Sequence, residues 1–157
     1  MDFDERLKEA ISRGERQHAA KANSAAREAV SEDELRRLHS QYRLELSEHI
    51  EQAVRRLPDH FLGFRYESLS GERGWGAGIS RDDVRRGGNS FSRLEVAIRP
   101  YSSSHVVELT AKGTISNKEI FNRTHYQRIW EVDLANYRHT IDLWIIEYAE
   151  RYAAQTS

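Results

Sequence analysis

Four glycines fall within residues 70–78, and a glycine-rich loop of this kind can hold a phosphate group. A nucleotide-binding P-loop needs Lys followed by Ser or Thr after its last glycine, at the start of a helix, whereas Gly78 is followed by Ile79. We therefore interpret the segment as a β-hairpin leading into a strand in which Gly76 and Gly78 leave bare backbone on one face. Trp75 is their neighbour in the sequence and would offer a stacking surface there.

Metal and nucleophile chemistry have little support in the sequence. None of the seven histidines is paired at the i, i+2, i+3 or i+4 spacing by which a strand or helix presents two ligands to one ion. The chain has no Cys and no Gly-x-Ser-x-Gly motif, and the adjacent carboxylates Asp82 and Asp83 would diverge in a loop. We expect no catalytic residue, no metal ligand and no cofactor. The sequence therefore favours a role other than catalysis, with an enzyme as the alternative.

Arginines concentrate in a polar stretch, residues 81–89, that we expect to be a loop. The stretch contains Arg81, Arg85 and Arg86. The flanking cations are Arg73, Arg93 and Arg99. Arg81, Arg85 and Arg86, together with Trp75, predict a surface for an anion or a macromolecular partner, because guanidinium groups pair with phosphates and aromatic rings stack on bases. Nucleic-acid binding is an alternative rather than the leading interpretation, since such domains usually have a pI above about 9 and this chain has a pI of about 6.7.

The net charge of −1 conceals regions of opposite sign. Residues 1–60 carry 11 Lys and Arg against 13 Asp and Glu, residues 61–130 carry 11 against 7, and residues 131–157 carry 2 against 5. Nine of the eleven cations in the middle region are Arg, which favours planar, bidentate contacts. The sequence therefore predicts a basic middle region between acidic flanks.

Good helix formers, Ala above all, predict a helical arm over residues 1–30 that is interrupted or bent near Gly14. The arm has few large apolar residues, so it is either a close-packed Ala interface or a helix ordered by a partner. A new helix is expected to begin at Ser31, because Ser followed three residues later by Glu has the form of a capping box. It is expected to end at Leu57, before Pro58.

From residue 61 the apolar pattern changes from the helical period to a period of two, which is typical of strands. The connectors between the alternating runs are short and turn-like, which favours an antiparallel meander. A helix over about residues 133–153 follows, with one apolar stripe that would cover the sheet. We predict an α+β domain over residues 31–157, in which N-terminal helices and a C-terminal helix pack on one face of a four- to five-stranded antiparallel β-meander.

Three large aliphatic residues fall on the wrong sides of their predicted helices. Leu44 projects opposite the apolar stripe of its helix, and Leu143 and Ile146 give the C-terminal helix a second apolar side. Single exposed apolar residues are ordinary, but two on one helix favour a partner. We expect a homodimer formed through the helices, since two-fold symmetry is the commonest in oligomers.

A small-molecule pocket between the sheet and the C-terminal helix is a further alternative. It would be lined by Tyr66, Trp75, Tyr137 and Trp144, four aromatic residues on elements that the pattern brings together.

The leading hypothesis is a non-catalytic, self-associating protein-interaction module, with an unknown protein as its other partner. No apolar run approaches the roughly 18 residues that span a bilayer, and the first residues are mixed and acidic where a signal peptide would be basic and then apolar. We therefore expect a cytoplasmic protein with no membrane partner.

Overall fold

The computed structural model describes residues 2–85 and 88–156, except for the side chains of residues 24–30, 85 and 156. Its elements in chain order are α1 (Phe3–Val54), α2 (Leu57–His60), β1 (Arg65–Leu69), β2 (Trp75–Arg85), β3 (Gly88–Ile98), β4 (Val106–Ile115), β5 (Lys118–Arg128), a 3-10 turn (Ile129–Glu131) and α3 (Leu134–Thr156). The chain divides into two compact units, Met1–Arg37 and Leu38–Ser157. Helices and an antiparallel sheet together confirm the predicted α+β class.

The first unit is helical throughout its described length. Asp2 caps the start of α1, because its Oδ1 accepts a hydrogen bond from the Glu5 N–H at 2.9 Å. The helix continues through Gly14 and Ser31 without a break, so the predicted interruption and the predicted new start at residue 31 are both wrong. Glu34 does not reach back to a cap and pairs instead with Arg37, one turn along the same helix. Strong helix formers on both sides of residue 31 outweigh the local capping signal.

The end of the long helix also differs from the prediction. α1 ends at Val54 rather than Leu57, and a four-residue helix, α2, follows from Leu57 to His60. Pro58 lies in the first turn of α2, where its missing N–H would have no partner in any case. Proline therefore starts a short second helix here, in addition to ending the first.

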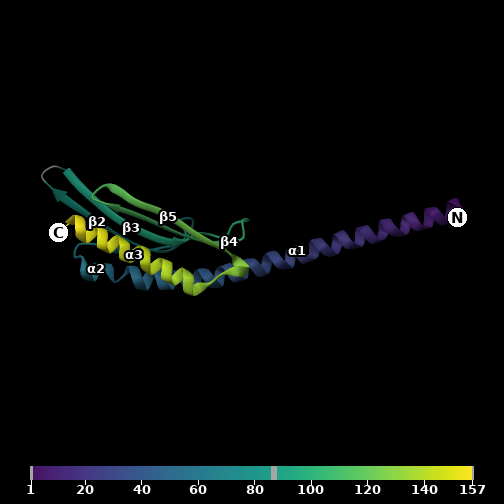
Figure 1. Cartoon of the computed structure of the whole chain (residues 1–157), viewed down its shortest axis with the longest axis horizontal. Coiled ribbons are helices and arrows are strands. Elements are labelled where there is room, and N and C mark those ends of the chain that lie inside the picture. The colour runs from purple at the N-terminus through teal and green to yellow at the C-terminus, as the bar shows by residue number, and fades with distance from the viewer. Residues whose placement is uncertain (1, 86–87, 157) are drawn as a thin grey trace. The chain divides into compact units, whose positions relative to one another are not determined.

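The second unit contains the sheet and the helices that cover it. The strands follow one another in the order β1-β2-β3-β4-β5, and each pair is antiparallel, as the short connectors predicted. α3 and the C-terminal part of α1 lie on the same side of the sheet (Figure 1). The largest fully buried side chains between these layers include Leu46, Ile50, Leu94, Ile98, Leu109, Tyr137, Ile141 and Tyr148. The predicted apolar stripes of the two helices are thus confirmed as the faces that form the core.

Residues 81–85 and 88–89 of the polar stretch are strand rather than loop, and residues 86 and 87 lie outside the described part. β2 and β3 pair from Trp75 opposite Ile98 out to Arg85 opposite Gly88, which makes a long hairpin. Ion pairs replace apolar packing along β2: Arg81 Nε to Asp83 Oδ1 at 2.8 Å, and Asp82 Oδ2 to Arg65 on β1 at 3.2 Å. Polar residues can extend a strand in this way because the backbone ladder does not depend on side-chain polarity.

The glycines of β2 allow its backbone to approach β3 closely. A Cβ atom on Gly76 would collide with the Val96 carbonyl oxygen and lie 2.9 Å from the Ala97 Cα, so no other residue fits without a shift of backbone. A Cβ on Gly78 would lie 3.1 Å from the Leu94 carbonyl oxygen. What comes near the bare backbone of β2 is therefore the neighbouring strand of the same sheet. Because Gly76 and Gly78 have no side chains, β2 leaves bare backbone on this face of the sheet.

Candidate functional site

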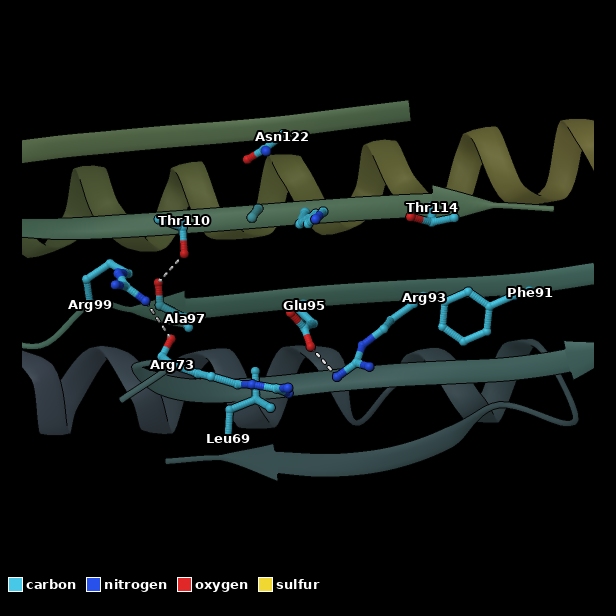
Figure 2. A pocket seen from close by; sticks show the side chains of 12 residues that line it. Leu69, Arg73, Phe91, Arg93, Glu95, Ala97, Arg99, Thr110, Thr114 and Asn122 are labelled. Atoms are coloured by element: carbon cyan, nitrogen blue, oxygen red, sulfur yellow. Dashed lines mark hydrogen bonds and ion pairs between the residues drawn. The ribbon is translucent and has the colours of Figure 1, made fainter. Parts of the chain in front are cut away.

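The sheet face away from the helices carries a groove of about 600 Å³. Strand alternation puts Arg93, Glu95 and Ala97 of β3 on this face, while Leu94, Val96 and Ile98 point to the core. Arg99, the residue after the end of β3, also lines the groove. The lining residues are Leu69, Arg73, Phe91, Arg93, Glu95, Ala97, Arg99, Thr110, Ala111, Lys112, Thr114 and Asn122. Figure 2 shows them distributed over neighbouring strands, with Arg93 and Arg99 toward opposite ends. We call this feature the outer groove.

Arg93 is held in place by two carboxylates. Its Nη2 donates to Glu67 Oε1 on β1 at 2.7 Å and also forms an ion pair with Glu95 on its own strand. The Arg93 Nε is buried and has no hydrogen-bond partner among the described residues. Both carboxylate contacts are made by Nη2, so the guanidinium, which carries five N–H donors, keeps hydrogen-bonding capacity at Nη1.

The other end of the groove is also cationic. The Arg99 side chain donates only weakly, through Nη1, to the carbonyl oxygens of Glu72 and Arg73 at 3.4 and 3.3 Å (Figure 2). Arg73 contributes its own side chain to the lining. Lys112 on β4 lies directly opposite Glu95 in the register. Counting Glu67, which pairs with Arg93, the outer groove has four cations against two carboxylates, so its net charge is positive and it favours anionic groups.

Neutral hydrogen-bonding groups also line the outer groove. Thr114 pairs with Arg93 in the register, and Asn122 on β5 pairs with Lys112. Thr110 Oγ1 lies 3.5 Å from the Ala97 carbonyl oxygen. An amide offers both donors and an acceptor, and a hydroxyl offers one donor and two acceptor sites, so these groups suit a polar ligand that has both kinds of partner.

The predicted partner surface does not gather on the outer groove. Trp75 lies on the helix-facing side, opposite the face of Gly76, where the Arg43 guanidinium covers its ring at 4.1 Å. Arg81 also points away from the groove, since its Nη1 donates to the Leu62 carbonyl oxygen. Arg85 lies on β2 with a side chain outside the described part, and Arg86 lies outside the described residues.

The residues of the predicted small-molecule pocket lie on the helix side of the sheet. Tyr137 is fully buried, and its hydroxyl donates to the Val107 carbonyl oxygen and accepts from the Gln127 N–H at 2.8 Å. The Arg55 guanidinium covers the Tyr66 ring at 4.7 Å, and Trp144 is half-buried. None of the three residues lines the outer groove or the helix groove described next.

The helix layer has a second, more apolar groove of about 390 Å³ between α1 and α3, which we call the helix groove. Its lining residues are His49, Gln52, Ala53, Arg56, Leu57, Asp142, Ile145, Ile146 and Ala149. His49 Nε2 and Asp142 Oδ1 are 2.8 Å apart and join the two helices. Leu44, Leu143 and Ile146 are 63%, 50% and 59% exposed, so all three predicted association residues lie at the surface.

Sequence reasoning found part of the outer groove. The sequence predicts Arg73, Arg93 and Arg99 as cations that flank a loop, whereas no sequence motif marks Lys112 or Asn122. The alternation of apolar and polar residues over 93–99 predicts that residues 93, 95, 97 and 99 lie in one row on the same face of the sheet. Which residues of β4 and β5 join that row depends on strand register, and register is set by long-range pairing.

No protein-family model matches the chain, and neither the curated proteins nor the solved structures contain a significant match. Among the described residues, no group of three or more His, Cys, Asp or Glu side chains is arranged to hold a metal ion. No described helix is both long and apolar enough to cross a bilayer.

Proposed function

We propose that this chain is a non-catalytic protein-interaction module that self-associates through the outer face of its helix layer. The observation that carries the proposal is the exposure of Leu44, Leu143 and Ile146 on that face. Full burial of one such side chain contributes roughly 1.5–3 kcal/mol. A contact between two copies would shield several of them at once.

The helix groove supports the same proposal. Ile146 lines it, together with the small side chains Ala53 and Ala149, and small side chains allow a second helix to approach closely. The bond between His49 and Asp142 holds α1 against α3, so the surface is already formed before association. A two-fold arrangement would place the same groove on both sides of the interface.

The outer groove supports the non-catalytic part of the proposal. Glu67 and Glu95, the carboxylates beside Arg93, are both engaged with it in ion pairs. Arginine remains protonated at physiological pH and serves as a binding group rather than a base. The groove therefore resembles a recognition surface.

The test is the mass of the full chain in solution, measured by light scattering over a range of micromolar concentrations. We expect a mass near twice the 18.3 kDa of one chain. The double variant Leu143→Lys with Ile146→Lys should return the mass to that of a monomer while its circular dichroism is unchanged.

The matched control is Val84→Lys, which changes an 86% exposed apolar residue on β2, outside the helix layer, and should leave the mass unchanged. A monomeric wild-type chain at about 100 μM, a protein concentration that populates any contact with Kd in the micromolar range, would overturn the proposal. A double variant that still forms dimers would overturn the assignment of the interface.

A further inference from the structure

The structure assigns the outer groove as a binding site for an extended acidic peptide segment whose carboxylates reach both of its cationic ends. This site is on the opposite face of the sheet from the helix layer, and it rests on observations independent of self-association. Its defining residues are Arg73, Arg93, Arg99, Lys112 and Asn122.

The spacing of the cations calls for a long ligand. Arg93 lies on β3 and Arg99 directly follows its end, where the Arg99 N–H still pairs with the Glu108 carbonyl oxygen of β4. At about 3.3 Å per residue, six residues of extended chain separate their Cα atoms by roughly 20 Å. One phosphate or a small dicarboxylate cannot contact both ends at once. An extended peptide has nearly the same rise per residue as a strand, so acidic side chains about four to six residues apart would meet the two ends.

Two of the cations are available for a new partner. The side chains of Lys112 and Arg73 make no hydrogen bond or ion pair with any other described residue, although both line the groove. Arg99 is held only by two long contacts to carbonyl oxygens. Arg93 pairs with Glu67 and Glu95 through Nη2, which leaves its Nη1 without a hydrogen bond to any described residue. A charged hydrogen bond to a carboxylate is roughly twice as strong as a neutral one.

The middle of the groove favours a peptide over a nucleic acid. Asn122, Thr110 and Thr114 offer both donors and acceptors, which match the alternating N–H and C=O groups of a peptide backbone. A single-stranded nucleic acid is bound mainly by stacking on several aromatic rings, whereas Phe91 is the single aromatic residue in the lining. Glu95 would also repel a continuous line of phosphates.

The experiment is calorimetric titration of the full chain with a blocked synthetic peptide of about ten residues, with one Glu near each end and Ser, Thr and Gly between them, so that the two carboxylates are about 20 Å apart when extended. We expect saturable binding that weakens as salt is raised. Replacing one Glu by Gln should weaken binding by about tenfold, which corresponds to about 1.4 kcal/mol. Replacing both should abolish it.

Protein variants locate the site. Lys112→Gln, which breaks no bond of the free protein, and Arg99→Gln should each weaken binding about five- to tenfold. Arg138→Gln removes the same charge from an exposed position on α3, outside the groove, and should leave binding unchanged. The double variant Leu143→Lys with Ile146→Lys should still bind the peptide, which separates this inference from self-association.

Four outcomes would overturn the inference. One is that no binding occurs at millimolar peptide. Another is that oligothymidylate binds more tightly than the acidic peptide, which would make the groove a nucleic-acid site. A third is that inorganic phosphate, or the peptide with one Glu, competes as well as the full peptide, which would make the site one for a small anion. The fourth is that Lys112→Gln and Arg138→Gln have equal effects, which would reduce the interaction to net charge.

Discussion

Tyr137 joins two strands through its hydroxyl group. Val107 and Gln127 are partners in the β4–β5 register, and the buried hydroxyl satisfies the carbonyl of one and the N–H of the other. Burial raises the pKa of Tyr137 to about 12, since the charged phenolate is disfavoured there, although the Gln127 N–H acts in the opposite direction. The side chain therefore remains a neutral donor over the whole physiological pH range.

Tyr137→Phe should lower the free energy of unfolding by about 1–3 kcal/mol, because it removes the partner of the buried Val107 carbonyl and of the part-buried Gln127 N–H. Urea unfolding measures the loss, and amide exchange at Gln127 should become faster. The control is Tyr126→Phe, at a tyrosine that is 65% exposed, which should change the unfolding free energy by less than about 0.5 kcal/mol. Equal effects of the two substitutions would show that the hydroxyl bridge contributes nothing.

His39 predicts a dependence of stability on acid pH. Its ring is buried against Tyr101, and burial lowers the pKa of His39, with a smaller contribution from Arg43. The unfolded chain, whose histidines have a pKa near 6.5, therefore binds this proton first as the pH falls. The free energy of unfolding should decrease as the pH drops below about 6.5 and toward the lowered folded-state pKa.

His39→Leu should reduce that decrease, measured as the difference in urea unfolding free energy between neutral and mildly acidic pH. His60→Leu, which changes an exposed histidine on α2, is the matched control and should preserve the wild-type pH dependence. If the His39 variant loses stability over this range as steeply as the wild type, other groups account for the acid sensitivity.

At the scale of the elements, the close approach of β2 and β3 depends on glycine. Gly76→Ala should destabilise the chain by several kcal/mol or prevent folding, since the new methyl group meets backbone that cannot move independently. Gly78→Ala meets its nearest atom at 3.1 Å and should cost less. Thermal unfolding of both variants checks the order. A Gly78 variant less stable than the Gly76 variant would contradict the geometry.

At the scale of the whole molecule, self-association and stability are coupled. If two copies associate through the helix layer, the midpoint of thermal unfolding should rise with protein concentration, because dimer formation stabilises the folded state by mass action. Scanning calorimetry at several concentrations measures this rise. In the double variant Leu143→Lys with Ile146→Lys, the midpoint should be independent of concentration.

The sequence by itself determined the elements and their buried faces. The apolar stripes of α1 and α3 and the alternation along β3 and β4 predicted the core, because a helical period of 3.6 and a strand period of two are local properties of the chain. Short connectors predicted the antiparallel meander, since they leave no length for a crossover. Local patterns gave a wrong prediction at Ser31, where the helix continues, and at residues 81–85 and 88–89, which extend two paired strands.

Only the tertiary structure decided which polar residues share a surface. Arg73, Arg93, Arg99 and Lys112 are spread over about forty residues of sequence, and the strand register brings them to one groove. The same alternation that placed Gly76 on that face put Trp75 on the other, under Arg43. The physical reason is that side-chain direction follows from local backbone geometry, whereas proximity follows from pairing between distant strands.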